Sequence, residues 1–163
     1  MKNAKVILAF LISGCCSAQT TSLKGKIVDM RLDPMPGIFI LISDTVLIGR
    51  SDLDGKFEIV VSNNASQLQV RGIGMEEKDI DLPIKCDYLG IILIHAGTFD
   101  FMRPGKIDRL RKKDFRKLSD LYDKAFRIGI FPHQEPCFTE SFRPAKDRLK
   151  EIRRARRKIG EKI

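Results

Sequence analysis

Short alternations of apolar and polar residues fill the chain from about residue 22 to residue 96. In the stretch 56–62, Phe57, Ile59 and Val61 fall on one face and the residues between them on the other, which is the period of a β-strand. The pattern predicts six or seven short strands, with turn signals about every 8–12 residues. The predicted strands lie at 23–30, 38–43, 44–51, 56–62, 68–75, 78–84 and 88–96. Such spacing is typical of a mainly β fold, an antiparallel Greek-key-type β-sandwich.

After about residue 96, the apolar residues no longer recur at every second position but at the spacing of a helix. Apolar residues at helical spacing predict a helix over 106–129, which ends at a glycine. A loop with three prolines follows at 130–144, and a thin apolar stripe predicts a final helix over 145–163. We therefore expect three parts: a signal peptide at 1–18, a β-sandwich at 22–95 and a basic helical extension at 96–163.

The stretch GRSDLDGKFEI, residues 49–59, has two interpretations. Asp52 and Asp54 stand two apart with Gly55 behind them, as at the start of a calcium-binding loop. An EF-hand needs a bidentate Glu at position 12 and helices on both sides, whereas that position is Asn63 and the flanks are strand-like. Asp-Gly between strands instead favours a hairpin turn in which Gly55 adopts positive φ and Asp54 caps the turn. A weak two-carboxylate cation site is the alternative.

Four motifs in this part of the chain together resemble the carboxypeptidase-regulatory-like domain. LKGKIVD, PMPGIFILI, GRSDLDGKFEI and VRGIGME follow in order, and the resemblance covers residues 22 to about 95. Ser51 stands where the family usually has Thr, and Met75 where it usually has Tyr. The resemblance implies a transthyretin-like β-sandwich of the kind common in Bacteroidetes envelope proteins. It implies no enzyme, because fold and function are separable.

The first 18 residues have the layout of a secretory signal peptide. Two lysines precede an apolar run at 6–12, which is too short to span a bilayer, and small residues follow. Cleavage after Ala18 would leave Gln19 first. Alternatively, LISGC resembles a lipobox, in which Cys15 becomes a lipidated N-terminus. Both routes predict export to the periplasm or outer membrane, and no other stretch has the length and hydrophobicity of a transmembrane helix.

Two cysteines, Cys86 and Cys137, lie outside the signal region. Two interpretations stay open: a disulfide that closes a loop of about fifty residues, or two unrelated thiols. The two histidines, His95 and His133, belong to no recognisable catalytic motif. Because these four residues do not cluster, the sequence argues against a zinc site. We expect no metal ion and no cofactor.

The 30 Lys and Arg residues outnumber the 21 Asp and Glu residues, for a net charge of +9, and they are unevenly distributed. Residues 19–100 carry 8 basic and 12 acidic side chains, whereas residues 101–163 carry 20 basic and 9 acidic. Basic runs at 109–113 and 153–158 suit anionic lipid headgroups or lipopolysaccharide. Aromatic residues are sparse beside the second run, so nucleic acid is not an expected partner. The candidate anion-binding residues are Arg153, Arg154, Arg156 and Arg157; a solvated helix is the alternative.

The sequence contains no nucleophile motif, no zinc-protease motif and no phosphate-binding Gly-rich loop. We therefore expect a non-enzymatic exported envelope module that binds or positions an envelope partner through its sandwich. One alternative is an anion-binding surface protein that acts through the basic tail. Another is a small hydrolase on a transthyretin-like scaffold. The sequence argues against this alternative, because it contains no recognisable set of acid and base residues for catalysis.

The export hypothesis predicts the N-terminus of the mature protein. We expect mass spectrometry of the protein isolated from cells to find Gln19, or a lipidated Cys15, as the first residue, because the leader has a charged start, a short apolar run and small residues at the cut. Recovery of the chain with Met1 still in place would contradict export.

Overall fold

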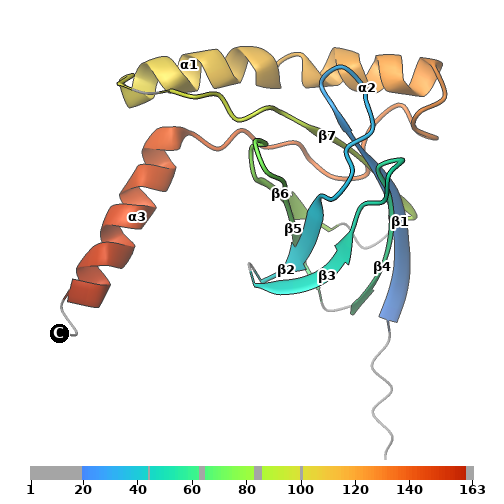
Figure 1. The fold of residues 1–163 in the computed structure, drawn as a ribbon, viewed down its shortest axis with the longest axis horizontal. Helices are drawn as coiled ribbons and strands as arrows, with labels where there is room; N and C mark the ends of the chain where they lie inside the picture. The colour runs from blue at the N-terminus through green and yellow to red at the C-terminus, as the bar shows by residue number, and fades with distance from the viewer. Residues whose placement is uncertain (1–19, 44, 63–64, 83–85, 100, 161–163) are drawn as a thin grey trace, which may run out of the picture.

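The structure, a computed structural model, describes residues 20–43, 45–62, 65–82, 86–99 and 101–160. Within these ranges seven strands are followed by three helices, and the fold is mainly β (Figure 1). Cys15 and the expected cleavage site lie outside the described residues.

The first sheet has the strand order β4-β1-β7, in which β1 is Thr20–Asp29, β4 is Lys56–Ser62 and β7 is Tyr88–Leu93. Strand β1 pairs with β4 in the antiparallel direction but with β7 in the parallel direction. The expectation of an entirely antiparallel fold is therefore wrong at this pair. Strands β1 and β7 are far apart in the chain, so a crossover connects them and no tight hairpin imposes an antiparallel pairing.

The second sheet is antiparallel, with the order β3-β2-β5-β6. Its strands are Phe39–Ile42 (β2), Val46–Arg50 (β3), Gln67–Arg71 (β5) and Lys78–Asp81 (β6). The two sheets share a main core, to which the first contributes Phe57, Ile59 and Val61, among others. The predicted alternation of this strand is confirmed, because these side chains are buried and their neighbours are exposed. The second sheet contributes Ile40, Leu68, Val70 and Ile80.

A second core lies on the other face of the first sheet and joins it to a helix. The helical pattern predicted at 106–129 forms two helices, α1 (Pro104–Phe115) and α2 (Leu118–Arg127), separated by a turn at 116–117. They lie end to end across one end of the sheets (Figure 1). The buried residues of α2 pack against β1 and β7, so this part of the helical extension is anchored to the first sheet. This second core includes Val28, Ile92, Leu118, Tyr122, Ala125 and Phe131.

Residues 131–143, here called the strap, connect α2 to the last helix and pack along the sheets. Phe138 enters the main core. Phe131 lies flat against Gly90, where a Cβ would come within 2.9 Å of the ring, so β7 needs glycine at that position. A disulfide joins Cys137 to Cys86, whose Cα atoms are 5.8 Å apart, and this pairing resolves the two alternatives left open by the sequence.

The last helix, α3, spans Ala145–Gly160 and runs away from the sheets (Figure 1). It begins beside α1, where the Ala145 N–H donates to Asp108 Oδ1. None of the helices in the described part of the chain has the length and hydrophobicity of a membrane-spanning helix.

The loop between β3 and β4 forms a tight turn. Gly55 has a φ of 74°, in the left-handed region, and its carbonyl accepts a hydrogen bond from the Ile27 N–H at 2.8 Å. Asp52 Oδ1 accepts from the N–H groups of Asp54 and Lys56 at 2.9 and 2.8 Å. The capping carboxylate is therefore that of Asp52, whereas Asp54, expected to cap the turn, forms an ion pair with Lys56 at 3.4 Å.

We expect Gly55→Val to lower the free energy of unfolding by about 1–3 kcal/mol, measured by urea denaturation. A Cβ at this position needs an unfavourable φ and would also contact the Ile27 carbonyl oxygen. Gly74 is a matched control, because its φ is also 74° but no atom lies within 4 Å of the position that a Cβ would take. Gly74→Val should therefore cost less; an equal cost would exclude the steric contribution at Gly55.

The turn interpretation also predicts that calcium leaves the melting temperature of the wild-type protein unchanged. Asp52 already accepts two backbone hydrogen bonds and Asp54 already faces a lysine, so a cation would have to displace these contacts. Thermal denaturation with calcium and with a chelator tests this. A rise of several degrees with calcium would support the cation-site alternative.

Candidate functional site

The residues singled out from the sequence lie in separate parts of the structure. Asp52, Asp54 and Gly55 form the turn between β3 and β4, and the two cysteines join the strap to the segment before β7. In α3, the side chains of Arg153, Arg154 and Arg157 are exposed, whereas that of Arg156 lies outside the described side chains. No common site is formed by these groups.

The two histidines each face one carboxylate. His95 Nε2 lies 3.3 Å from Asp29 Oδ2, and Asp29 Oδ1 accepts the N–H groups of Arg31 and Asp33 at 2.8 and 3.0 Å. Burial raises the pKa of Asp29, but these backbone hydrogen bonds and His95 outweigh it, and the pKa is lowered overall. Asp29 thus closes the turn after β1 as a carboxylate. In the described ranges, no three His, Cys, Asp or Glu residues gather closely enough to hold a metal ion.

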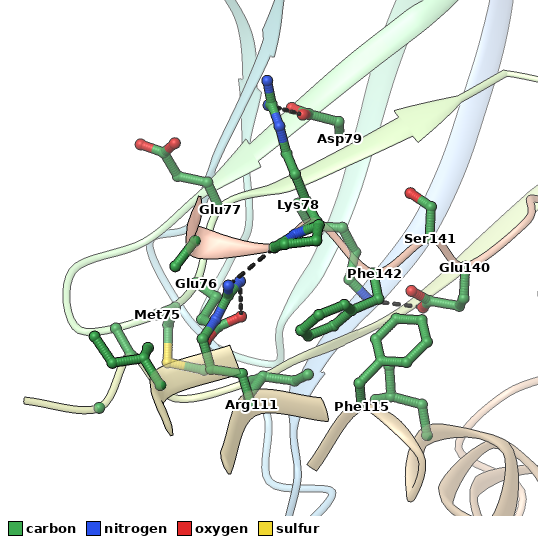
Figure 2. Close-up of a pocket in the computed structure, with 18 of the residues that line it drawn as sticks. Met75, Glu76, Glu77, Lys78, Asp79, Arg111, Phe115, Glu140, Ser141 and Phe142 are labelled. Atoms are coloured by element: carbon green, nitrogen blue, oxygen red, sulfur yellow. Dashed lines mark hydrogen bonds and ion pairs between the residues drawn. The ribbon is translucent and has the colours of Figure 1, made fainter. Parts of the chain in front are cut away.

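A groove of about 740 Å³ lies between the sheets and the helices, and no motif in the sequence predicts it. Its walls come from β6 and the loop before it, the segment 94–99, α1, the end of the strap and the first turns of α3 (Figure 2). A volume of this size is typical of ligand sites. The apolar lining comprises Met75, Ile94, Ala96, Phe99, Ile107, Phe115, Leu118, Phe142 and Leu149.

Arg111 of α1 crosses the groove and pairs with the loop before β6. Its guanidinium donates to both oxygens of Glu76, at 2.6 and 2.9 Å, and to the carbonyl of Arg143 at 2.9 Å (Figure 2). The hydrogen bond to Glu76 raises the pKa of Arg111 despite partial burial. Arg143 in turn pairs with Asp79 at 2.9 Å. These contacts tie the helix, β6 and the strap together around the groove.

Lys78, Glu140 and Tyr122 form a second polar cluster at the base of the groove. The Lys78 Nζ donates to Glu140 Oε1 at 2.6 Å and to the Ile92 carbonyl at 2.7 Å. The Tyr122 hydroxyl donates to the same glutamate oxygen at 2.8 Å. Burial lowers the pKa of Lys78, although Glu140 opposes the shift, and only 12% of its side chain is exposed. The cluster therefore links β6, β7, α2 and the strap.

The pairing of these charged groups decides what the groove can accept. The three cations Arg111, Lys78 and Arg143 are already paired with the carboxylates of Glu76, Glu140 and Asp79. A charged ligand would therefore have to break one of these partly buried ion pairs. A neutral, apolar group would instead cover the aromatic and aliphatic lining. No local signal could have revealed the site, because Lys78 and Glu140 are 62 residues apart in the chain.

No family model and no curated protein matches the chain. Among solved structures, it is similar to 3-chlorocatechol 1,2-dioxygenase from Rhodococcus opacus 1CP, with a TM-score of 0.34 and 10% identity over 49% of this chain. The matched part spans 61% of the dioxygenase. It is also similar to the C-terminal domain of the PapC usher, with a TM-score of 0.33 and 13% identity, over 47% of this chain and 100% of that domain. Similarities this low carry no argument about function.

One buried and one partly buried tyrosine predict an unusual alkaline titration. The chain has two tyrosines, Tyr88 and Tyr122, and no tryptophan. Burial raises the pKa of Tyr88 and raises that of Tyr122 well above its ordinary value, where Glu140 adds to the effect. In an absorbance titration of the folded protein, we expect both tyrosinate steps above the ordinary pKa of about 10, and that of Tyr122 to be the higher of the two.

The raised pKa values of the two tyrosines also determine how the stability of the folded protein changes with pH. Because the folded pKa values lie above the unfolded ones, the stabilising contribution is complete below a pH of about 10 and is lost as the pH rises through the folded values. In denaturant both tyrosines should titrate at about pH 10. Tyr122→Phe should remove the higher of the two steps in the folded protein. A two-tyrosine step at about pH 10 without unfolding would contradict the burial of Tyr122.

Proposed function

We propose that the chain is a non-enzymatic, exported envelope module with a transthyretin-like β-sandwich, which binds an apolar segment of a partner envelope protein in the groove. The observation that carries the proposal is the groove itself, because its apolar lining is open while its charged groups are paired with one another. The four motifs that resemble the carboxypeptidase-regulatory-like domain support the envelope setting.

The walls of the groove favour binding over chemistry. Lys78, at the base of the groove, has a lowered pKa, but a carboxylate at 2.6 Å keeps it in an ion pair and a backbone carbonyl accepts a second hydrogen bond from it. Glu140 accepts from both Lys78 and Tyr122, so it holds the base of the groove in place. His95, with Asp29, serves the turn after β1. We therefore assign Lys78 and Glu140 to the positioning of the groove, and His95 and Asp29 to the turn after β1.

A neutral, environment-sensitive dye such as Nile red tests the groove directly. Ala96 is exposed and lines the groove, so Ala96→Trp should occupy part of it and weaken dye binding by at least about tenfold, which corresponds to about 1.4 kcal/mol. Leu53→Trp is the matched control, because Leu53 is 88% exposed on the β3–β4 turn. Equal dye binding by the two variants, measured by fluorescence titration, would contradict an apolar site in the groove.

The partner is tested in cells with a photo-crosslinking amino acid at Ser141, an exposed residue of the groove. We expect one discrete protein adduct, which Ala96→Trp removes and Leu53→Trp leaves in place. An adduct that persists when the groove is filled would place the partner elsewhere. Ester or peptide hydrolysis that His95→Ala abolishes would favour the hydrolase alternative.

A further inference from the structure

The outer face of α1 and α2, together with the residue before them, carries a dense set of exposed cations. This surface is here called the ledge, and it spans residues 103–127, roughly 36 Å at 1.5 Å per residue. The side chains that α1 and α2 turn toward the sheets are the apolar and groove residues already described, so the exposed residues of the ledge face the other way. Its exposed basic residues are Arg103, Lys106, Arg109, Lys112, Lys113, Arg116, Lys117, Lys124 and Arg127.

The carboxylates of the same two helices neutralise little of the ledge. Asp108 binds the start of α3, Asp123 accepts from Gln134, and Asp114 pairs with Lys117 at 2.7 Å. These three are only partly exposed, which leaves Asp120 as the exposed acidic residue of α1 and α2. Apart from Lys117, the basic residues of the ledge form no ion pair within the part of the chain that the structure describes. The positive charge of the ledge is therefore turned to solvent.

Large apolar side chains stand among these cations. Leu110 is 41% exposed and Phe126 42%, and Ile128, which directly follows the ledge at the end of α2, is 57% exposed. Leu110 falls on the same helical stripe as Lys106 and Lys113, which are four residues before it and three after it. Cations beside exposed aliphatic side chains on a long helical face match a bilayer surface, where anionic headgroups lie directly above apolar chains. A soluble anion would make use of the charge alone.

We propose that the ledge is a docking surface for a bilayer that contains anionic phospholipids. The two helices lie in the plane of the headgroups, and Leu110 and Ile128 enter the layer just below them. The proposal goes beyond the groove and does not depend on what occupies it, because α1 lines the groove with its inner face. The sequence alone indicated two basic runs, at 109–113 and 153–158, and its candidate anion-binding residues were those of α3; the proposal moves the site to the exposed face of α1 and α2.

The structure offers a matched pair of variants that separates the two basic surfaces. The ledge variant replaces Arg109, Lys113, Arg116 and Lys124 with Gln, and the tail variant replaces Arg153, Arg154, Arg156 and Arg157 with Gln. Each removes four positive charges. The protein beginning at Gln19 is tested by co-sedimentation with vesicles of equal phosphatidylcholine and phosphatidylglycerol, and with pure phosphatidylcholine vesicles as the neutral reference.

We expect the wild type to bind the anionic vesicles and not the neutral ones. The ledge variant should bind on the order of 100-fold more weakly, given the attraction of several Lys and Arg residues to an anionic surface. The tail variant should keep most of its affinity. Binding should weaken steeply from about 0.01 to about 1 M salt, as the screening length falls from about 30 to about 3 Å. A greater or equal loss in the tail variant overturns the proposal.

Two controls keep the result interpretable. Exchange of Arg109, Arg116 and Arg127 for Lys retains the charge and should retain binding, which separates charge from any damage to the helices; loss of binding there overturns the proposal. At matched ionic strength, inorganic phosphate should not release the protein from the vesicles, because it offers no apolar layer; release would assign the ledge to soluble anions instead. Dye binding in the groove should be the same in all variants, so failure of either proposal is seen separately.

Discussion

Strand β1 is buried on both faces at its C-terminal end, residues 27–29, and the rest of the structure depends on this. Ile27 belongs to the main core and its neighbour Val28 to the second core, and neither exposes any surface. Hydrogen bonds to β4 and β7 satisfy its backbone on both edges. A strand buried in this way must be covered on each side, since exposure of either apolar row would cost roughly 25 cal/mol per Å². One cover is the second sheet, and the other is α2.

The position of α2 in turn brings the polar groups of the groove together. Leu118 and Ala125 seat the helix on the first sheet, which places the Tyr122 hydroxyl within 2.8 Å of Glu140. The same glutamate neutralises Lys78, whose ammonium would otherwise be buried at a cost of several kcal/mol. The strap that carries Glu140 is held by the disulfide and by Phe138 in the main core. The groove therefore has walls from distant segments, each tied to the next by a short contact.

Helix α1 has a separate chemistry on each side. Its inner side contributes Ile107, Arg111 and Phe115 to the groove, where the cation is paired and partly buried. Its outer side contributes exposed cations such as Arg109 and Lys113, for which the described residues provide no carboxylate partner. Under the two proposals, one face binds a neutral segment and the other meets an anionic surface. A protein docked through the ledge would hold its groove beside the membrane, where an envelope partner can reach it.

The sequence by itself determined the features that arise from neighbouring residues. The alternation of Phe57, Ile59 and Val61 specified a strand with one buried face, and the Asp-Gly pair specified the turn at Gly55. Helical spacing located α2 and α3, because side chains three and four residues apart share a face. These patterns are local, so they can be recognised without knowledge of the remaining chain. They predicted most strands and helices, although not the break between α1 and α2.

Only the tertiary structure decided which distant segments meet. The parallel pairing of β1 with β7, the disulfide and the contact of Lys78 with Glu140 each join residues far apart in the chain. Strand period and turn chemistry carry no information about such partners, because many arrangements satisfy them equally well. The choice is made by burial of both faces of β1, and the groove and the ledge follow from it. That is why the sequence indicated a basic extension but not which of its faces would remain exposed.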